Sequence, residues 1–227
     1  SLIKKLGKPE MTQDQKPHSR FIIRTFPVGP LQCNCSIIGD RLSSKALVVD
    51  PGGDADQILG LLEELNLTVV GIIHTHAHLD HILASGVIKE ATGAPIYLHE
   101  GDKFLWDMVG QQCVMFGVPP VTLPEPDHFM EDDQALNCCG GVAIHTPGHT
   151  PGSISFWFEE YKTLIAGDTL FQGSIGRTDL PGGNFDQIIT SIKERIYTLD
   201  DDAIVVTGHG PNTAIGSEKT GNSFVRG

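Results

Sequence analysis

The densest group of potential metal ligands in the chain is one short segment, His76-Ala77-His78-Leu79-Asp80-His81. It directly follows the apolar run 69–73, which is expected to form a buried strand. Residues two apart in an extended segment point to the same side, so His76 and His78 can converge on one ion. Asp80 and His81 follow where the chain is expected to turn, and they can reach a neighbouring position. Neutral imidazole and carboxylate groups suit Zn²⁺, Fe²⁺ or Mn²⁺, so we interpret the segment as the centre of a metal site.

Three later segments each place one potential ligand directly after a predicted strand. His149 lies in a turn that proline and glycine make rigid, Asp168 follows an apolar run, and His209 lies between two glycines. The Asp168 carboxylate has two oxygens and can bridge two ions. An isolated histidine after a strand is more often a hydrogen-bonded structural residue. Four such segments in this order nevertheless indicate one shared site.

The composition restricts the classes of partner. The 227 residues carry a formal net charge of −12, and 40% of them are hydrophobic, as in an ordered globular protein. The acidic balance argues against a nucleic-acid partner, because that binding depends on clustered Lys and Arg. No apolar stretch approaches the roughly 18 residues of a membrane-spanning helix, and the polar N-terminus lacks the apolar core of a secretion signal. We therefore expect a cytoplasmic protein with no membrane partner.

The cysteines give no sign of a disulfide framework. An odd number of cysteines without a secretion signal predicts reduced thiols. Neither pair of neighbouring cysteines is accompanied by a second pair of ligands at the spacing of a zinc site. The cysteines are therefore expected to be small buried residues. They are Cys33, Cys35, Cys113, Cys138 and Cys139.

Alternating apolar residues and turn signals predict two similar halves, each with strands, then a helix, then a strand. The strands are expected at residues 21–26, 34–38, 46–49, 69–73, 95–98, 142–145, 153–158, 163–166 and 203–206. The helices are expected from an N-cap at Asp54 to Leu65 and at residues 84–91, 103–109 and 185–197. The proline-rich segment 117–127 is expected to be a loop that crosses between the halves. Two such halves can pack sheet on sheet with their helices outside.

The order His-x-His-x-Asp-His, Thr-Pro-Gly-His, Gly-Asp and Gly-His-Gly-Pro resembles the metallo-β-lactamase superfamily over roughly residues 21–215. The resemblance implies an α/β (α+β) fold, the four-layer αββα sandwich, with metals at one edge of the two sheets. One such domain is expected over residues 21–227, after an N-terminal tail of residues 1–20. The implied cofactors are two divalent ions, with Zn²⁺ as the first expectation and Fe²⁺ or Mn²⁺ as alternatives. By motif position, the first metal would bind His76, His78 and His149, the second Asp80, His81 and His209, and Asp168 would bridge them.

Departures from other branches narrow the choice within the superfamily. The true β-lactamases carry Cys or a non-bridging residue where this chain has Asp168, which argues against antibiotic hydrolysis. The flavodiiron branch has Glu in place of His78, which argues against oxygen reduction at two irons. The nuclease branches carry extra domains or basic surfaces that this sequence does not show.

The glycine-rich segment 171–183, which closely follows Asp168, resembles compact glyoxalase II-type enzymes through its Gly-Arg-Thr-Asp-Leu-Pro-Gly-Gly sequence. Segment 208–224 resembles the same group, except that Ser223 replaces its usual proline. The resemblance implies that hydroxide bound to the metals hydrolyses a small-molecule glutathione thioester, such as S-D-lactoylglutathione, to the hydroxy acid and glutathione. Asp80 and Asp168 would orient this nucleophile as ligands.

Glutathione recognition is expected from residues outside the metal motif. The long glyoxalase II enzymes have a further C-terminal helical domain that supplies glutathione-binding residues, whereas this sequence runs only to Gly227. Arg177 is the candidate for a substrate carboxylate, because Arg can bind one in a bidentate manner. The alternative is a structural role, in which the Arg177 side chain contacts its own loop and stabilises it. Lys219 is a second candidate, beside the alternative of a solvated lysine.

Two other functions remain open. A persulfide dioxygenase of the same superfamily has a similar Gly-Arg-Thr-Asp loop and would use one Fe²⁺ held by His76, His149 and Asp168. That branch usually continues with Phe-Gln, whereas Leu180-Pro181 follows here and favours the hydrolase. The second alternative is a hydrolase of a lactone or another ester that uses the same metals. No residue of the sequence indicates the oligomeric state. The remaining histidines expected to be structural or to orient ligands are His74, His99, His128 and His145.

Overall fold

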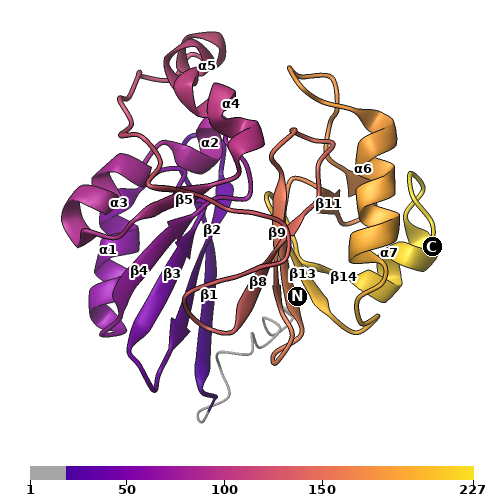
Figure 1. Cartoon of the computed structure of the whole chain (residues 1–227), viewed down its shortest axis with the longest axis horizontal. Coiled ribbons are helices and arrows are strands. Elements are labelled where there is room, and N and C mark those ends of the chain that lie inside the picture. Colours follow the sequence, from indigo (N-terminus) through magenta and orange to yellow (C-terminus); the bar gives the residue numbers. More distant parts are fainter. Residues whose placement is uncertain (1–18) are drawn as a thin grey trace, which may run out of the picture.

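The computed structural model describes residues 19–227, and its strands form two six-stranded sheets that face each other with helices outside both (Figure 1). The predicted four-layer αββα sandwich is therefore confirmed. Of the predicted N-terminal tail, residues 1–18 lie outside the described part. Arg20 is tied to the first sheet, because its guanidinium lies 3.0 Å from the buried Asp40 carboxylate.

The first sheet contains the strands of the N-terminal half, in the order in which they occur along the chain. They are β1 (Phe21–Val28), β2 (Cys33–Asp40), β3 (Lys45–Val49), β4 (Thr68–Ile73), β5 (Ile96–Leu98) and β6 (His128–Phe129). β3, β4 and β5 are parallel, so their C-terminal ends lie at one edge of the sheet. The segment that carries four of the predicted ligands leaves β4 at this edge.

The second sheet has the order β14-β13-β10-β9-β8-β7. Its strands are β7 (Gln134–Ala135), β8 (Gly141–His145), β9 (Ile154–Phe158), β10 (Thr163–Gly167), β13 (Ile204–Thr207) and β14 (Thr213–Ala214). β10 and β13 are parallel, so Asp168 and His209, which follow them, emerge at the same edge. A separate two-stranded ribbon consists of β11 (Leu170–Phe171) and β12 (Ser174–Ile175).

Helices cover the outer face of each sheet (Figure 1). Those of the first half are α1 (Ala55–Glu64), α2 (Leu79–Ile82), α3 (Ser85–Thr92), the 3-10 turn η2 (Glu100–Asp102), α4 (Lys103–Asp107) and α5 (Val109–Phe116). Those of the second half are α6 (Phe185–Ser191), the π-helical turn η3 (Ile192–Ile196) and α7 (Ile215–Gly221). α1 and α3 lie along the first sheet, whereas α4 and α5 lie at the end of the sandwich near α2. Among residues 19–227, no helix is both long and apolar enough to cross a bilayer.

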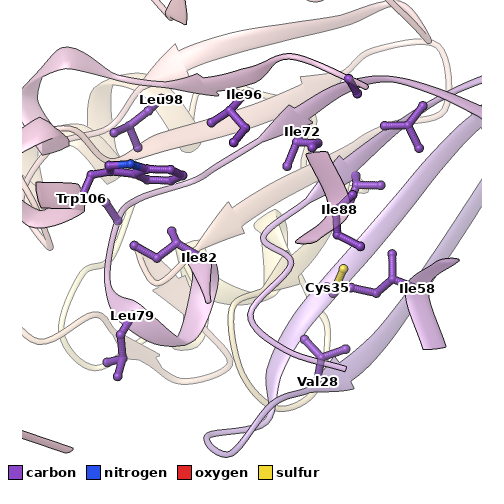
Figure 2. Close-up of a cluster of buried hydrophobic side chains, with 14 of the residues drawn as sticks. Val28, Cys35, Ile58, Ile72, Leu79, Ile82, Ile88, Ile96, Leu98 and Trp106 are labelled. Carbon is purple, nitrogen blue, oxygen red and sulfur yellow. The ribbon is translucent and has the colours of Figure 1, made fainter. Parts of the chain in front are cut away.

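Three apolar cores separate the four layers. In the first, Ile58 of α1 and Ile72 of β4 are fully buried between helices and sheet (Figure 2). The second lies between the sheets and joins Leu47 of the first to Phe156 of the second. The third contains Ile188 of α6 and covers the outer face of the second sheet. β9 and β10 are buried along their whole length, because the other sheet covers one face and helices cover the other.

The proline-rich segment 117–127 is a loop, as predicted, but the expectation that it crosses between the halves is wrong. It stays on the first half, where Trp106 Nε1 donates to the Pro124 carbonyl at 2.9 Å. Asp127 accepts from the Ile96 N–H at 2.7 Å just before β6 pairs with β5. The chain crosses to the second sheet only after β6, because apolar residues between the prolines pack against the first core.

The helices differ from the prediction in several places. The helix expected to end at residue 109 is followed directly by α5, and α7 was not predicted. Asp54 is the N-cap of α1, but its side chain does not cap the helix. It accepts instead from the Gly29 N–H at 2.9 Å, which ties the loop after β1 to the start of α1.

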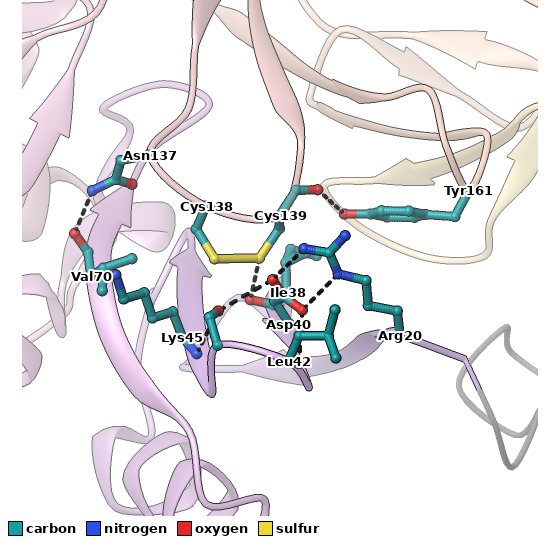
Figure 3. Close-up of a disulfide and its surroundings, with 11 residues drawn as sticks. Arg20, Ile38, Asp40, Leu42, Lys45, Val70, Asn137, Cys138, Cys139 and Tyr161 are labelled. Atoms are coloured by element: carbon teal, nitrogen blue, oxygen red, sulfur yellow. Dashed lines mark hydrogen bonds and ion pairs between the residues drawn. A yellow bond between two sulfur atoms is a disulfide. The ribbon is translucent and has the colours of Figure 1, made fainter.

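Cys138 and Cys139, on the turn before β8, form a disulfide between adjacent residues (Figure 3). The expectation that all five cysteines are reduced is therefore wrong for this pair. Counting and spacing rules address links between distant cysteines, so they overlook a pair of neighbours. The turn is fixed on both sides, since Cys139 Sγ lies 3.5 Å from the Ile38 carbonyl and Tyr161 Oη donates to the Cys139 carbonyl at 3.2 Å. The free and buried cysteines are Cys33, Cys35 and Cys113.

Candidate metal centre

The ligand segment leaves β4 as extended chain and then turns into α2, which begins directly after His78. Residues 74–78 belong to no helix or strand, and the backbone at His78 is extended. Asp80 and His81 lie on the first turn of α2. The predicted turn after His78 is confirmed.

All seven predicted ligands lie in two adjoining groups. Within each group, one potential ligand atom per residue lies within 4.8 Å of the others. The first group is His76, His78 and His149, and the second is Asp80, His81, Asp168 and His209. Asp168 joins the groups, because its Oδ2 lies 3.8 Å from His76 Nε2 and 3.6 Å from His149 Nε2. Its Oδ1 lies 3.4 Å from His81 Nε2 on the other side, as the predicted bridging position requires.

Four buried atoms in this cluster lack a hydrogen-bond partner. They are Nε2 of His76, His78 and His81, and Oδ1 of Asp168. A buried polar atom without a partner costs about 1–3 kcal/mol, so four of them in one place call for a common partner. Divalent cations are such partners, because imidazole nitrogens and carboxylate oxygens both donate electron pairs to them. The cluster fits a dinuclear metal site.

Charge is distributed unevenly within the cluster. Burial lowers the pKa of His78 to about 3, and burial also places the pKa of His76 well below its ordinary value. Both rings are therefore neutral and ready to bind a cation at pH 7. Hydrogen bonds with Asp168 and Asp80 raise the pKa of His209 to about 9. The two carboxylates thus favour positive charge beside them, supplied either by a proton on His209 or by a metal ion.

Asp50, the residue directly after β3, supports both groups from behind. Its Oδ2 accepts from His81 Nδ1 at 2.9 Å and from Thr75 Oγ1 at 2.6 Å. Thr75 Oγ1 lies 3.0 Å from His76 Nδ1. Both rings are thus engaged through Nδ1, and Nε2 of each faces the cluster. Cys33 Sγ also lies 3.2 Å from His81 Nδ1. Cys33 and Asp50 therefore orient the His81 ring from the side opposite to Asp80 and Asp168.

Each ligand of the second half directly follows a glycine that lies against another segment. A Cβ atom at any of these glycines would collide with its neighbour: Gly148 with Ile188, Gly167 with Thr75, and Gly208 with Asp168. His149 is further oriented by a hydrogen bond from Nδ1 to the Arg177 carbonyl at 2.7 Å. The loop after β12 therefore lies directly beside the first group.

The family profile of the metallo-beta-lactamase superfamily matches residues 28–209. This range includes all seven residues of the cluster. The chain belongs to the metallo-β-lactamase superfamily. As a metallo-β-lactamase-fold protein whose ligand cluster fits two metals, it is a metallo-hydrolase.

Curated relatives of this metallo-hydrolase match it over nearly their whole length. It is 40% identical over 207 residues to the hydroxyacylglutathione hydrolase GloC of Haemophilus influenzae, which covers 89% of this chain and 97% of that protein. It is 41% identical over 209 residues to the probable metallo-hydrolase YqgX of Bacillus subtilis, which covers 90% of this chain and 97% of that protein. The first of these relatives hints at the glyoxalase II-like branch.

Similar solved structures carry several functional names. The BLEG-1 B3 metallo-β-lactamase is 36% identical with a TM-score of 0.83, covering 91% of this chain and 100% of that one. TTHA1623 in a di-iron-bound form is 33% identical with a TM-score of 0.83, covering 89% and 100%. ETHE1 from Myxococcus xanthus is 28% identical with a TM-score of 0.73, covering 89% and 83%.

The two predicted substrate residues lie in different surroundings. The Arg177 carbonyl contacts His149, while its guanidinium is 57% exposed and makes a bidentate ion pair with Asp179 at 2.6 and 2.8 Å. This contact is the one that the alternative of a loop-stabilising Arg177 describes. Lys219 Nζ lies 2.8 Å from Asp201, in the turn that precedes β13 and thus at the other end of that strand from the cluster. The structure does not bring Lys219 to the metal ligands.

The histidines outside the cluster make structural contacts. His74 uses both ring nitrogens, since Nδ1 lies 2.9 Å from the Tyr97 carbonyl and Nε2 lies 2.6 Å from Ser85 Oγ. His99 and His145 stack with ring centroids 4.1 Å apart, which joins the end of β5 to the end of β8. These contacts connect elements around the site without reaching its centre.

Several buried residues that contact the ligand segment were not predicted, among them Asp50, Asp102 and Gln112. Asp50 had a detectable signal, because it directly follows the predicted strand 46–49, just as Asp168 follows its own strand. Asp102 and Gln112 had none. They lie on helical elements, and their contact with the ligand segment depends on tertiary packing.

Proposed function

We propose that the chain hydrolyses glutathione thioesters, with an S-2-hydroxyacylglutathione such as S-D-lactoylglutathione as substrate and the hydroxy acid and glutathione as products. The observation that carries this proposal is the convergence of seven ligands in two adjoining groups, an arrangement suited to two-metal hydrolysis. The choice of substrate is supported by the 40% identity with the hydroxyacylglutathione hydrolase GloC over 97% of that protein.

The residues of the cluster have distinct roles in this reaction. Two divalent ions would lower the pKa of water towards about 7 and polarise the thioester carbonyl. His76, His78 and His149 would hold one ion, Asp80, His81 and His209 the other, and Asp168 would contact both. As ligands, Asp80 and Asp168 would also orient the attacking water. The glutathione thiolate is a good leaving group, so no side chain has to protonate it.

Arg177 is our candidate for a carboxylate of the glutathione moiety. Its loop lies beside the first group, and its guanidinium already binds a carboxylate, that of Asp179, in a bidentate manner. An exposed ion pair contributes only about 0–1 kcal/mol, so a substrate carboxylate can exchange with Asp179 at little cost. Lys219 is not retained in this role.

The test is hydrolysis of S-D-lactoylglutathione by the purified chain, followed by release of free thiol, with metal content measured on the same sample. A simple lactoyl thioester, a lactone and a cephalosporin serve as comparison substrates. We expect the glutathione thioester to be preferred over the lactone and the cephalosporin by at least about tenfold in kcat/KM. A chain that holds two metals and hydrolyses the lactone or the cephalosporin but no thioester would contradict the proposal.

A persulfide dioxygenase activity is the second candidate, supported by the likeness to ETHE1 from Myxococcus xanthus. Such a site would need only His76, His149 and Asp168, which do lie together, with one Fe²⁺. The complete second group, with Asp80 2.9 Å from His209, favours the two-metal hydrolase. Oxygen uptake with glutathione persulfide, together with one iron per chain, would favour the dioxygenase.

We propose Zn²⁺ as the resident metal, with Fe²⁺ and Mn²⁺ as the alternatives. Iron is supported by the di-iron-bound form of the similar protein TTHA1623. We also propose that the enzyme acts in the cytoplasm, because its substrate and product belong to the glutathione pool of that compartment.

A further inference from the structure

Ala77 lies between two ligands of the first group, and both of its backbone groups are fixed by side chains from elsewhere. The residue is fully buried in a segment without regular secondary structure, so its N–H and C=O need partners. Its N–H donates to Asp102 Oδ2 at 2.9 Å, and its carbonyl accepts from Gln112 Nε2 at 3.1 Å. The η2–α5 region therefore determines the path of the backbone between His76 and His78.

The Asp102 carboxylate also holds the segment that carries the third ligand of this group. Oδ2 accepts from Thr150 Oγ1 at 2.8 Å, and Oδ1 accepts from the Gly152 N–H at 2.6 Å. Thr150 directly follows His149. A single, fully buried carboxylate thus connects the ligand segment of the first half to that of the second half. Asp102 is the N-cap residue of α4 but makes no side-chain cap bond to it, so these contacts account for its carboxylate.

The fit around this carboxylate is tight. A Cβ atom at Gly152 would lie 2.6 Å from Asp102 N and 2.7 Å from Asp102 Oδ1. A Cβ atom at Gly101 would lie 3.0 Å from Gly152 N. Such close approach excludes a water molecule that could replace a lost hydrogen bond, so a change at Asp102 must shift the two segments relative to each other.

We propose that Asp102 is a positioning residue that sets the separation of His76 and His78 from His149 and thereby the affinity of the first group for its metal. This inference rests on the two-metal site of the proposed function. Asp102 makes no contact with the second group, in which Asp50 orients His81. The affinity of the second group should therefore be independent of Asp102.

The test uses Asp102→Asn, which keeps the size of the side chain but replaces one acceptor with a donor. It is combined with His209→Ala, which weakens the second group so that the remaining ion reports on the first. Asp40→Asn is the matched control, because Asp40 is also buried and accepts from Arg20, the Leu42 N–H and Ser43 Oγ outside the metal cluster. The readouts are Zn²⁺ affinity by competition with a chelator and the midpoint of unfolding in denaturant.

In the His209→Ala background, we expect Asp102→Asn to weaken the remaining Zn²⁺ by about tenfold to a hundredfold. Asp40→Asn should lower the unfolding midpoint while leaving this affinity unchanged. Thr150→Val removes one donor to the carboxylate and should weaken binding in the same direction but less, which keeps the test valid if Asp102→Asn does not fold.

Unchanged Zn²⁺ affinity in Asp102→Asn or, if that variant does not fold, in Thr150→Val would overturn the inference. Equal loss in Asp102→Asn and Asp40→Asn would also overturn it, because the effect would then reflect general stability. A wild-type chain that binds two metals but hydrolyses no thioester would refute the proposed function and leave the role of Asp102 intact.

Discussion

The two halves of the sandwich hold their predicted metal ligands mainly by different contacts. The first half presents four ligands on one segment, and buried side chains hold this segment by hydrogen bonds, above all Asp50 and Asp102. The second half presents three ligands on three separate loops, and each directly follows a glycine pressed against another segment. Hydrogen bonds can be weakened gradually, whereas a close backbone approach tolerates no added atom. The first half also has one such approach, because a Cβ atom at Gly52 would collide with the Asp80 carbonyl. Substitutions that weaken a hydrogen bond and substitutions that add an atom at a packed glycine should therefore have different effects.

The largest effect is expected at Asp168, where the two halves meet. Asp168→Ala removes the carboxylate that lies between the two groups. Metal content at both positions and kcat for the thioester should therefore fall by orders of magnitude. His78→Ala should also lower metal content and turnover by orders of magnitude while affecting the first group more. Metal content and kcat on the same samples test this, and full activity in either variant would refute the site assignment.

The role of the closely packed glycines in the second half can be tested at Gly208, with Gly210 as the control. A Cβ atom at Gly208 would collide with the Asp168 carboxylate, so Gly208→Ala should abolish binding of at least one metal. Gly210 has a φ of 75° and nothing within 4 Å of an added Cβ. Gly210→Ala should therefore cost only about 1 kcal/mol of stability and retain both metals. Equal metal content in the two variants would show that the close approach at Gly208 does not matter.

The role of the side-chain hydrogen bonds that hold the ligand segment of the first half can be tested at Asp50. Asp50→Asn keeps the size of the side chain but weakens the hold on His81 and Thr75, so the affinity for the second metal should fall by about tenfold to a hundredfold. Chelator competition measures this affinity. A loss as complete as that in Gly208→Ala would remove the proposed difference between the halves.

Arg177 offers a smaller effect that separates backbone from side chain. Arg177→Ala leaves the carbonyl that orients His149 but removes the guanidinium, so KM for glutathione thioesters should rise by about three- to tenfold. Asp179→Asn should change KM in the opposite direction, because it releases the guanidinium from its ion pair. Steady-state kinetics with a simple lactoyl thioester provide the control, and equal changes for both substrates would exclude recognition of glutathione by Arg177.

The smallest effect concerns the stacked pair that joins the two halves beside the site. Burial, together with the neighbouring His145, lowers the pKa of His99 to about 4 from an ordinary value of 6.5. The unfolded chain therefore binds more protons between pH 6.5 and 4, and stability should fall as the pH falls through this window. His99→Asn keeps an acceptor for the Gly101 N–H without titrating, so it should reduce this dependence. Denaturant midpoints of the chelator-treated chain at pH 7 and pH 5 measure the change, and identical pH dependence in both proteins would contradict it.

The sequence predicted the sandwich and the seven residues that the structure brings together, because these features depend on local patterns. Apolar runs identified the strands, and a polar residue directly after a strand identified each ligand segment. The same rule applied to Asp50 would have predicted a residue of the site. Asp102 and Gln112 could not be found in this way, because their contacts with Ala77 arise only when η2 and α5 pack against the ligand segment.

The failures have similar physical causes. The path of loop 117–127 depends on apolar contacts with the first core, which its prolines conceal in the sequence. The pairing of Cys138 with Cys139 escaped rules designed for distant cysteines. The surroundings of Lys219 were also not predictable, because its ion pair with Asp201 depends on where α7 docks, and α7 itself was not predicted.

The central claim is that ligands from both halves together bind two metals, and counting metals by native mass spectrometry tests it most directly. The wild-type chain should carry two divalent ions, and His209→Ala should carry one, because only the second group loses a ligand. A wild-type chain that carries a single ion, retained unchanged in His209→Ala, would contradict the two-metal account and favour a mononuclear enzyme.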